Sequence, residues 1–410
     1  MPENDNKLLK RKLFISDYCY TPKKRIVNAT ILCENDKIAA IGNASAFSPD
    51  PKLDVYDLRG TYAVPGFIDT HIHGAGGFDS STVDEGTEDF RLMCKTLASH
   101  GVTSFLPTLI SRPKDKLLAS ISAFATLLKK NHIGAEPLGI RLEGPYISRI
   151  KRGSQNANYI RPIDLGELKE MISAGEGKIK IMTFAPELNN SIKLIEILVE
   201  NNIIPSMGHT MADELTVLKA IDAGVSHCTH LYNGMPILHH RSVGIAGVAL
   251  TDDRVTIEII LDGFHIHPRM IDIVSRTKPK DKIIGVSDAI QGAGLKDGTY
   301  HLGKTKIEVI NGRAETKDGT IAGTTLTLER GWNILVNHSQ LDFKDAAACL
   351  TTNPARLLNL KDHGELRPGR NANIAFFNTK TNKAVLTVRS GKIVYNDKNQ
   401  TFDIHKRIRD

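Results

Sequence analysis

Six residues of types that bind metal ions or transfer protons in enzymes stand at the ends of short apolar runs. They are His71, His73, Glu143, His209, His230 and Asp288. Residues two apart on an extended strand point to the same face, so His71 and His73 can bind one ion. Imidazole nitrogens and carboxylate oxygens suit zinc or iron, and a catalytic site leaves one position open for water. The residue types therefore predict a centre for one or two divalent ions per chain, with zinc, iron or manganese as the expected metals.

The elements that must position these side chains are short β-rich runs that alternate with helical stretches from Gly66 onward. We expect strands at Phe67–His71, Val102–Thr108, Leu138–Glu143, Ile179–Phe184, Ile203–Gly208, Val225–His230, Val255–Leu261 and Lys282–Ser287. Between them, the stretch Lys114–Lys130 has apolar residues at spacings of three and four, which is typical of a helix with one buried face. Eight strands with helical crossovers predict a (β/α)8 TIM-type barrel, in which the active site lies at the C-terminal ends of the strands.

The shared position of the six residues supports the metal hypothesis, because a single histidine is more often structural than a ligand. Chance would have to place all six at the same end of five strands while the other strand interiors stay apolar. We expect no such role for the remaining histidines whose placement differs: His100, His132, His227, His239, His240, His267, His301 and His338.

The two ends of the chain have a different pattern, in which alternating apolar and polar residues predict strands. Such runs occur at Arg25–Cys33 and Lys37–Ile41, and again at Asn373–Asn378 and Ala384–Tyr395. We expect residues 1–65 and 365–410 to form one small β-sandwich domain and residues 66–364 to form the catalytic barrel. A hairpin insertion is expected near residues 298–320, where Asn311-Gly312 is a turn signal.

Composition favours a cytoplasmic enzyme with a small-molecule substrate. The 53 basic and 46 acidic residues give a net charge of +7 that is spread along the chain, and the densest basic run is Lys7–Lys12. No apolar run approaches the roughly 20 residues that span a bilayer. The five cysteines form no closely spaced pair, which fits a reducing compartment. We therefore expect neither a nucleic acid nor a membrane as partner.

Several motifs resemble those of a known enzyme family. The run Val64–Gly74 resembles the strand by which members of the amidohydrolase superfamily enter their barrel. With it, other segments are similar to those of the N-acetylglucosamine-6-phosphate deacetylases: Leu142–Pro145, Gly208–Thr210, Thr229–Asn233, Leu261–Gly263, Ser287–Ala289, Asp318–Gly323 and Gly364–Gly369. The resemblance implies a hydrolase of a linear amide that converts N-acetyl-D-glucosamine 6-phosphate to D-glucosamine 6-phosphate and acetate, in amino-sugar catabolism and cell-wall recycling.

The resemblance also implies roles for individual residues. Asp288 would be the general base. Glu143, His209 and His230 would be the main metal ligands, and His71 and His73 would hold a second ion. The substrate phosphate would be bound by Asn233, Gly234, Arg241 and His265. Arg241 would reach in from the other subunit of a homodimer.

Two positions depart from the expected pattern, and one of them, Asn371 where the wider superfamily usually has an aspartate, is expected to be structural. The other lies among the site residues. Members usually have a histidine after the conserved glutamate, in a Lys-Gly-x-His-Asn run, and that side chain helps to polarise the acetyl carbonyl. This chain has Gln155, in Arg152-Gly-Ser-Gln-Asn156. A glutamine amide donates hydrogen bonds but cannot become cationic. We still expect Gln155 to bind substrate, and the departure leaves N-acetylgalactosamine 6-phosphate open as an alternative substrate.

Two other functions would be compatible with part of this pattern. Cyclic-amide hydrolases of the dihydroorotase type share the His-x-His strand but resemble one another in a carboxylated lysine at the end of the fourth strand. Here Lys178 and Lys180 stand at the start of that run, and Glu143 on the third strand takes the place of the lysine. A non-catalytic amino-sugar sensor on the same barrel would have no use for the proton shuttle that Asp288 provides.

Overall fold

Eight parallel strands form a nearly closed barrel in the computed structural model, which describes residues 10–47, 53–398 and 403–405. The strands are β6 Phe67–Ile72, β9 Val102–Ile110, β11 Ile140–Glu143, β12 Ile179–Phe184, β13 Ile204–Met207, β14 His227–Cys228, β15 Thr256–Ile260 and β16 Ile283–Val286. Each strand pairs with its neighbours in this order. The last strand returns to the first, because Asp288 donates its N–H to the carbonyl of His71 at 2.9 Å and Ile72 pairs with Ala289. The predicted barrel is confirmed.

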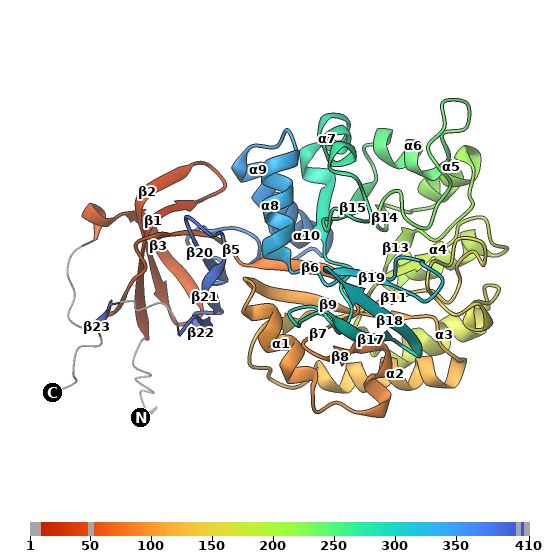
Figure 1. Ribbon diagram of the computed structural model, residues 1–410, viewed down its shortest axis with the longest axis horizontal. Helices are drawn as coiled ribbons and strands as arrows, with labels where there is room; N and C mark the ends of the chain where they lie inside the picture. Colours follow the sequence, from red (N-terminus) through yellow and green to blue (C-terminus); the bar gives the residue numbers. More distant parts are fainter. Residues whose placement is uncertain (1–9, 48–52, 399–402, 406–410) are drawn as a thin grey trace, which may run out of the picture.

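Helices surround the barrel (Figure 1). They are α1 Phe90–Ala98, α2 Lys114–Leu127, α3 Leu165–Ala174, α4 Ser191–Glu200, α5 Glu214–Asp222, α6 Gly244–Thr251, α7 Pro268–Thr277, α8 Leu328–His338, α9 Phe343–Leu350 and α10 Thr352–Leu357. The predicted helix near Lys114 is α2, and it buries Leu117, Ile121 and Phe124 against the barrel. Each such side chain contributes about 1.5–3 kcal/mol of hydrophobic free energy, so the apolar stripe fixes the helix on the strands.

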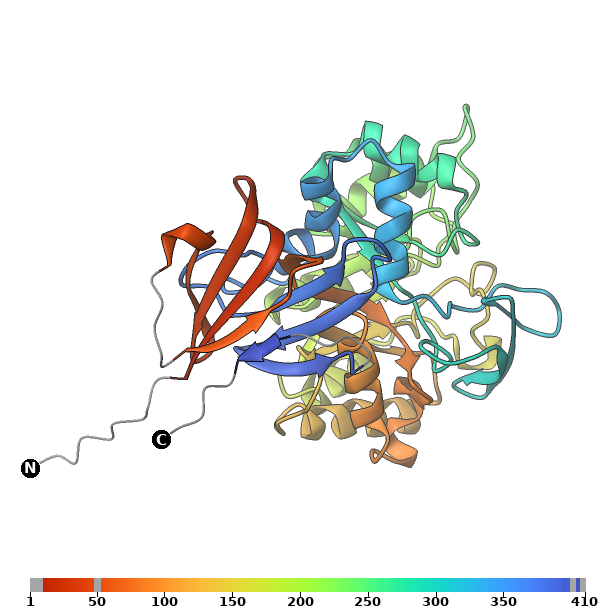
Figure 2. The same cartoon turned by 60° about the vertical axis from the view of Figure 1, so that its left-hand side comes forward.

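Both ends of the chain build a second sheet. Its strands are β1 Arg11–Tyr20, β2 Arg25–Glu34, β3 Lys37–Asn43, β4 Asp54–Asp57, β5 Thr61–Pro65, β20 Ile374–Asn378, β21 Ala384–Arg389, β22 Lys392–Asn396 and β23 Asp403–His405. Antiparallel pairing of β20 with β5 joins the two ends (Figure 2). Because β1 pairs with β4 along one part and with β5 along another, the sheet divides around a core that includes Phe14, Ile31 and Phe376. The predicted β unit is confirmed, and its boundaries at residues 65 and 365 stay a prediction.

The predicted insertion is a three-stranded antiparallel sheet rather than a simple hairpin. It comprises β17 Gly298–Leu302, β18 Thr305–Ile310 and β19 Arg313–Glu315. At the turn between β18 and β19, Asn311 and Gly312 have φ of 53° and 76°, the left-handed values that a tight hairpin requires. Leu302 and Ile307 pack with Ile110 of β9. The insertion is thereby fixed beside the C-terminal end of the barrel. Three further short strands are β7 Gly74–Ala75, β8 Phe78–Asp79 and β10 Glu136–Pro137.

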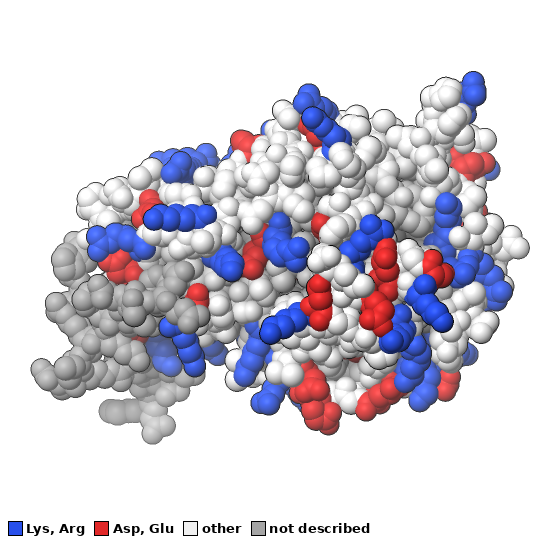
Figure 3. All heavy atoms as spheres, in the orientation of Figure 1, with Lys and Arg blue, Asp and Glu red and all other residues white. Residues whose placement is uncertain are grey.

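Charges of both signs are interspersed over the face shown in Figure 3. Residues 7–9 of the basic run Lys7–Lys12 lie outside the described part of the chain. Within the described part, no helix is both long enough and apolar enough to cross a bilayer. All five cysteines are buried and unpaired.

Candidate metal centre

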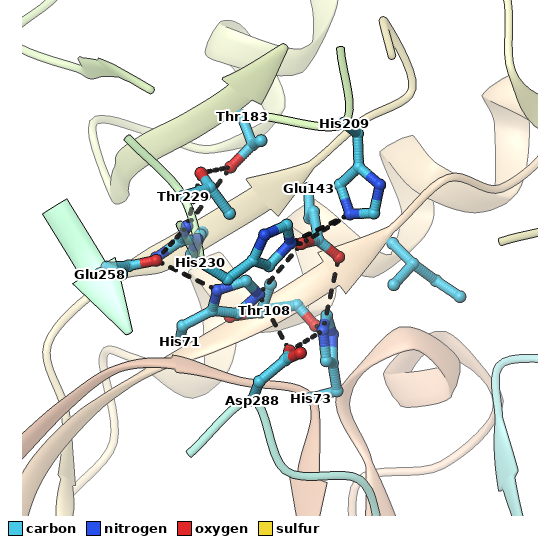
Figure 4. Close-up of polar contacts among 12 residues, drawn as sticks. His71, His73, Thr108, Glu143, Thr183, His209, Thr229, His230, Glu258 and Asp288 are labelled. Carbon is cyan, nitrogen blue, oxygen red and sulfur yellow. Dashed lines mark hydrogen bonds and ion pairs between the residues drawn. The ribbon is translucent and has the colours of Figure 1, made fainter. Parts of the chain in front are cut away.

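The six predicted residues converge at the mouth of the barrel (Figure 4). Their donor atoms form two groups, in each of which the atoms lie within 4.8 Å of one another: His71, His73 and Asp288 in one, and Glu143, His209 and His230 in the other. None of the six is more than 7% exposed. Glu143 lies between the groups, since its Oε1 is 3.0 Å from His230 Nε2 and 3.2 Å from His71 Nε2. The six residues predicted from the sequence therefore lie together in one small volume.

Hydrogen bonds at Nδ1 orient three of the imidazole rings. His209 Nδ1 lies 2.7 Å from the carbonyl of Lys151, and His73 Nδ1 lies 3.3 Å from the carbonyl of Thr108. A carbonyl oxygen only accepts, so each Nδ1 carries the proton and each Nε2 keeps its lone pair for the centre. His71 is held differently, because its Nδ1 lies 3.3 Å from a carboxylate oxygen of Glu258.

The donor set fits divalent cations. His209 Nε2 and His230 Nε2 approach to 3.1 Å, and both lie within 3.3 Å of Glu143 Oε1. His71 Nε2 is buried and makes no well-aligned hydrogen bond to any described residue, although Glu143 Oε1 at 3.2 Å and Asp288 Oδ1 at 3.3 Å face it. A buried polar atom left unpaired costs about 1–3 kcal/mol, which a bound cation would offset. Four imidazoles and two carboxylates are also the ligands that zinc and iron prefer in catalytic sites.

Three of these residues sit at strained backbone positions. The backbone φ is 48° at His209, 27° at His230 and 49° at Asp288. These values lie in the left-handed region, which residues other than glycine rarely adopt. Such residues cost roughly 1–3 kcal/mol each and cluster at functional sites. The neighbouring Gly234 has φ of 62°, and a Cβ there would lie 2.8 Å from His209 Nδ1. Only glycine fits this close approach to the ring.

The carboxylates of the centre are held in their charged form. Burial opposes ionisation of Glu143, but His71 and His209 outweigh it and hold the pKa of Glu143 well below its usual range. Burial also opposes ionisation of Asp288, and His71 and His73 lower the pKa of Asp288 to about 2. Both carboxylates therefore lie where positive charge beside them stabilises the ionised form, which is the charge that a bound cation would supply.

A cavity of about 310 Å³ opens above the centre. Its lining includes four of the predicted substrate residues, namely Gln155, Asn233, Gly234 and His265. Leu302 and Ile321 border it from the insertion and the segment that follows it. Arg241 is absent from the lining and lies exposed in the loop between β14 and α6. Thus one chain collects every predicted site residue except Arg241, which the resemblance assigned to a neighbouring subunit.

Hydrogen bonds within the protein fix the side chains of two cavity residues, Gln155 and His265. Gln155 donates from Nε2 to the backbone carbonyl of Glu143 at 3.2 Å and to its Oε2 at 3.1 Å, and it accepts the N–H of Ser111 at 3.0 Å. In this structure Gln155 orients Glu143, and its contact with substrate stays a prediction. His265 Nδ1 lies 2.7 Å from Asp262 Oδ2, a contact that sequence reasoning did not anticipate.

Sequence reasoning also missed a polar layer beneath the centre. The expectation that the other strand interiors stay apolar is wrong, because buried polar side chains fill the barrel interior: Thr70, Arg141, Thr183, Ser206, His227, Thr229 and Glu258. His227, for which we expected no role at the site, belongs to this layer, with Nδ1 2.8 Å from Ser206 Oγ. The sequence could have indicated one member of this layer. Side chains two apart on a strand point to the same face, so Arg141 had to point inward like Glu143.

Comparison with known proteins places the chain in a family. The sequence model of the amidohydrolase family matches residues 62–398. The chain belongs to the amidohydrolase family.

Individual relatives are similar over most of their length. N-acetylglucosamine-6-phosphate deacetylase of Bacillus subtilis (strain 168) is 33% identical over 388 residues, which cover 93% of this chain and 97% of the relative. N-acetylgalactosamine-6-phosphate deacetylase of Escherichia coli O157:H7 is 31% identical, over 82% of this chain and 88% of the relative. A solved structure of a variant of the Mycobacterium smegmatis N-acetyl-D-glucosamine-6-phosphate deacetylase, in complex with N-acetyl-D-glucosamine-6-phosphate, matches with a TM-score of 0.87 and 30% identity, over 94% of this chain and all of that chain.

Proposed function

We propose that this amidohydrolase removes the acetyl group from N-acetyl-D-glucosamine 6-phosphate and releases D-glucosamine 6-phosphate and acetate. The observation that carries the proposal is the convergence of two ligand groups, one of which contains Asp288, beneath one cavity. That cavity occurs in a chain 33% identical over 388 residues to a deacetylase of this kind.

Glu143, His209 and His230 would hold the more tightly bound ion, and His71 and His73, with Asp288 nearby, would hold a second. We propose zinc, iron or manganese for these positions. A divalent ion supplies Lewis acidity toward the acetamide oxygen and lowers the pKa of a water molecule.

Asp288 is placed to move the proton that the reaction requires. Its Oδ1 lies 3.1 Å from His73 Nε2 and 3.3 Å from His71 Nε2, at the floor of the cavity. Its carboxylate would accept a proton from water as the water oxygen bonds to the acetyl carbon. It would then pass that proton to the amide nitrogen as the C–N bond breaks, so that acetate and an amine leave.

Asn233, Gly234 and His265 would bind the sugar phosphate from the cavity wall. Asp262 accepts from His265 Nδ1, which leaves Nε2 as the ring nitrogen free to contact the substrate. Their position above the centre supports a substrate whose phosphate lies at one end and whose acetamide reaches the metal ligands.

We propose that Arg241 completes the phosphate site from the second subunit of a homodimer. The loop between β14 and α6 protrudes from the barrel (Figure 1), and both Arg241 and Ile237, which is 87% exposed, lie on the surface of this loop. Mixing Arg241→Ala chains with Asp288→Asn chains should restore activity, because each mixed dimer has one intact composite site. If exchange of subunits is demonstrated and the mixture is no more active than the two separate variants together, the shared site is wrong.

The decisive experiment uses purified enzyme with a panel of 6-phosphorylated N-acetylhexosamines and scores free amine and acetate. We expect fastest turnover of the glucosamine compound. The galactosamine compound is the second candidate, because the similarity to the Escherichia coli galactosamine enzyme extends over 82% of this chain. Dihydroorotate serves as the cyclic-amide control. Turnover of dihydroorotate alone would overturn the proposal.

We also propose a cytoplasmic location for the enzyme. Five buried, unpaired cysteines support a reducing compartment.

A further inference from the structure

Glu258 is a fully buried carboxylate that borders the centre on the side of His71 (Figure 4). From β15 it reaches His71, whose Nδ1 lies 3.3 Å from Glu258 Oε2. It also accepts the hydroxyl of Thr70 at 3.0 Å and forms a two-pronged ion pair with the guanidinium of Arg141, in which Arg141 Nη2 lies 2.9 Å from Oε2. No proton-transfer step proposed above uses this carboxylate.

The contact with His71 differs from those of the other candidate ligands. His73 and His209 hold their Nδ1 protons on backbone carbonyls, and His230 Nδ1 has no hydrogen-bond partner among the residues that the structure describes. His71 is the one ring of the four whose Nδ1 faces a charged acceptor, and a charged acceptor forms a stronger hydrogen bond than a neutral carbonyl. Such a bond fixes both the orientation of the ring and the proton at Nδ1, and it makes Nε2 a better electron donor.

Arg141 compensates the cost of burying this carboxylate. The guanidinium is itself fully buried, and it donates to the carbonyl of Thr70 at 3.1 Å and to Thr229 Oγ1 at 3.0 Å. The ion pair is therefore anchored to β6, to the end of β14 and to its own strands β11 and β15. Glu258 can move little, so its contact with His71 is set by the barrel itself.

We propose that Glu258 is a positioning residue for the second metal ion. It holds His71 with the proton on Nδ1, so that Nε2 presents its lone pair toward His73 and Asp288. The inference rests on the proposed metal-dependent function, and it assigns to the buried ion pair a role beyond filling the barrel.

Two double variants isolate this contact. Arg141→Met/Glu258→Gln removes both charges but keeps an oxygen that accepts from His71 Nδ1, whereas Arg141→Met/Glu258→Leu removes the acceptor as well. Replacing both partners leaves no unpaired buried charge, so both chains should fold. Thr183→Val is the control for loss of a buried polar group, since Thr183 contacts Thr229 and Arg141 but neither His71 nor Glu258.

The readout is zinc binding to metal-free protein, measured by competition with a chromophoric chelator in the absence of substrate. Anomalous diffraction assigns each ion to its ligands. We expect the leucine variant to lose about 10- to 100-fold in affinity for the ion at His71 and His73, and to keep wild-type affinity at Glu143. The glutamine variant should lose less, and Thr183→Val should bind both ions as the wild type does.

Equal affinities in the two double variants would overturn the inference while leaving the metal site intact. Failure of the wild type to bind any ion would overturn the proposed function as well. A test that needs no variant is the two-bond proton–nitrogen spectrum of zinc-loaded wild-type protein labelled at histidine. We expect His71 to carry its proton on Nδ1, and a proton on Nε2 would overturn the inference even if the variants do not fold.

Discussion

Two layers of buried polar side chains lie one above the other inside the barrel. The upper layer is the candidate metal centre, and the lower layer is the polar group beneath it that contains Arg141 and Glu258. The two layers differ in how their buried charges are compensated. In the upper layer, imidazole nitrogens and carboxylate oxygens converge on each other, with His209 Nε2 and His230 Nε2 only 3.1 Å apart. In the lower layer, charged and polar groups meet partners of complementary kind, above all Arg141 and Glu258. The carboxylates of the upper layer would be compensated by bound metal ions, whereas the carboxylate of Glu258 in the lower layer is compensated by the guanidinium of Arg141.

The backbone follows the same division. Three upper-layer residues follow the ends of their strands at positive φ, while Arg141 and Glu258 lie within strands β11 and β15. Strain at functional positions persists because the surrounding fold enforces it. Buried polarity alone therefore does not identify an active site in this barrel, but uncompensated polarity at strained positions does.

Metal removal should separate the layers most clearly. Dialysis against a chelator should reduce deacetylation to background, and adding zinc, iron or manganese should restore it. The fold should persist, because the lower layer holds no metal, but thermal unfolding should shift downward. An ion at 100 times its Kd stabilises the folded state by about 2.7 kcal/mol. Full activity in protein that elemental analysis finds free of metal would contradict the upper layer's assignment.

Asp288→Asn tests proton transfer in the upper layer. The amide keeps the shape of the side chain but cannot accept the proton, so kcat should fall by roughly 100-fold to 10,000-fold. KM should change less. Steady-state kinetics on N-acetylglucosamine 6-phosphate measures both, with zinc content as the control for an intact centre. A variant that retains most of its kcat would show that Asp288 is not the base.

Arg141→Met alone tests the lower layer by leaving Glu258 buried without its cation. Breaking one side of a buried ion pair typically costs about 3–5 kcal/mol, whereas replacing both partners is often close to neutral. Urea unfolding of metal-free protein should therefore show a large loss of stability for the single variant and a small one for Arg141→Met/Glu258→Leu. Equal losses would mean that the two charges do not compensate each other.

Arg241→Ala tests a cation that lies outside both layers. Charge-assisted hydrogen bonds to phosphate contribute about 1.5–3 kcal/mol each, so kcat/KM for the phosphorylated sugar should fall at least tenfold. The slow turnover of unphosphorylated N-acetylglucosamine should hardly change. Equal losses on both substrates would make Arg241 a structural residue.

Thr183→Val should have the smallest effect. Its hydroxyl shares a 2.9 Å hydrogen bond with Thr229 in the lower layer, and a typical bond of this kind contributes about 0.5–1.5 kcal/mol. Unfolding should show a loss of that size and kcat should stay unchanged. A marked fall in kcat would mean that the lower layer takes part in catalysis more widely than through Glu258.

Local patterns were sufficient to predict much of this protein. Apolar runs of strand length predicted the eight barrel strands, and the polar residues that end those runs predicted His71, His73, Glu143, His209, His230 and Asp288 as neighbours. This succeeded because parallel strands deliver their C-terminal ends to one rim, so position along each strand is enough to bring the residues together.

Other features required the tertiary structure. Three contacts between pairs of residues could not be predicted from any motif. Gln155 orients Glu143, and Asp262 orients His265. Glu258 contacts His71 from within the barrel. Arg141 and Glu258 are 117 residues apart in sequence. Whether a buried polar residue is a ligand or a partner of another side chain depends on which groups face it across the barrel.

The sequence by itself determined which side chains reach the rim, because alternation along a strand and the direction of parallel strands are local rules. Only the tertiary structure decided how their atoms face one another: which imidazole nitrogen is held by a carbonyl, which by a carboxylate, and which lone pairs remain for an ion. The reason is physical, since hydrogen bonding and charge compensation depend on distances of about 3 Å between residues far apart in the chain.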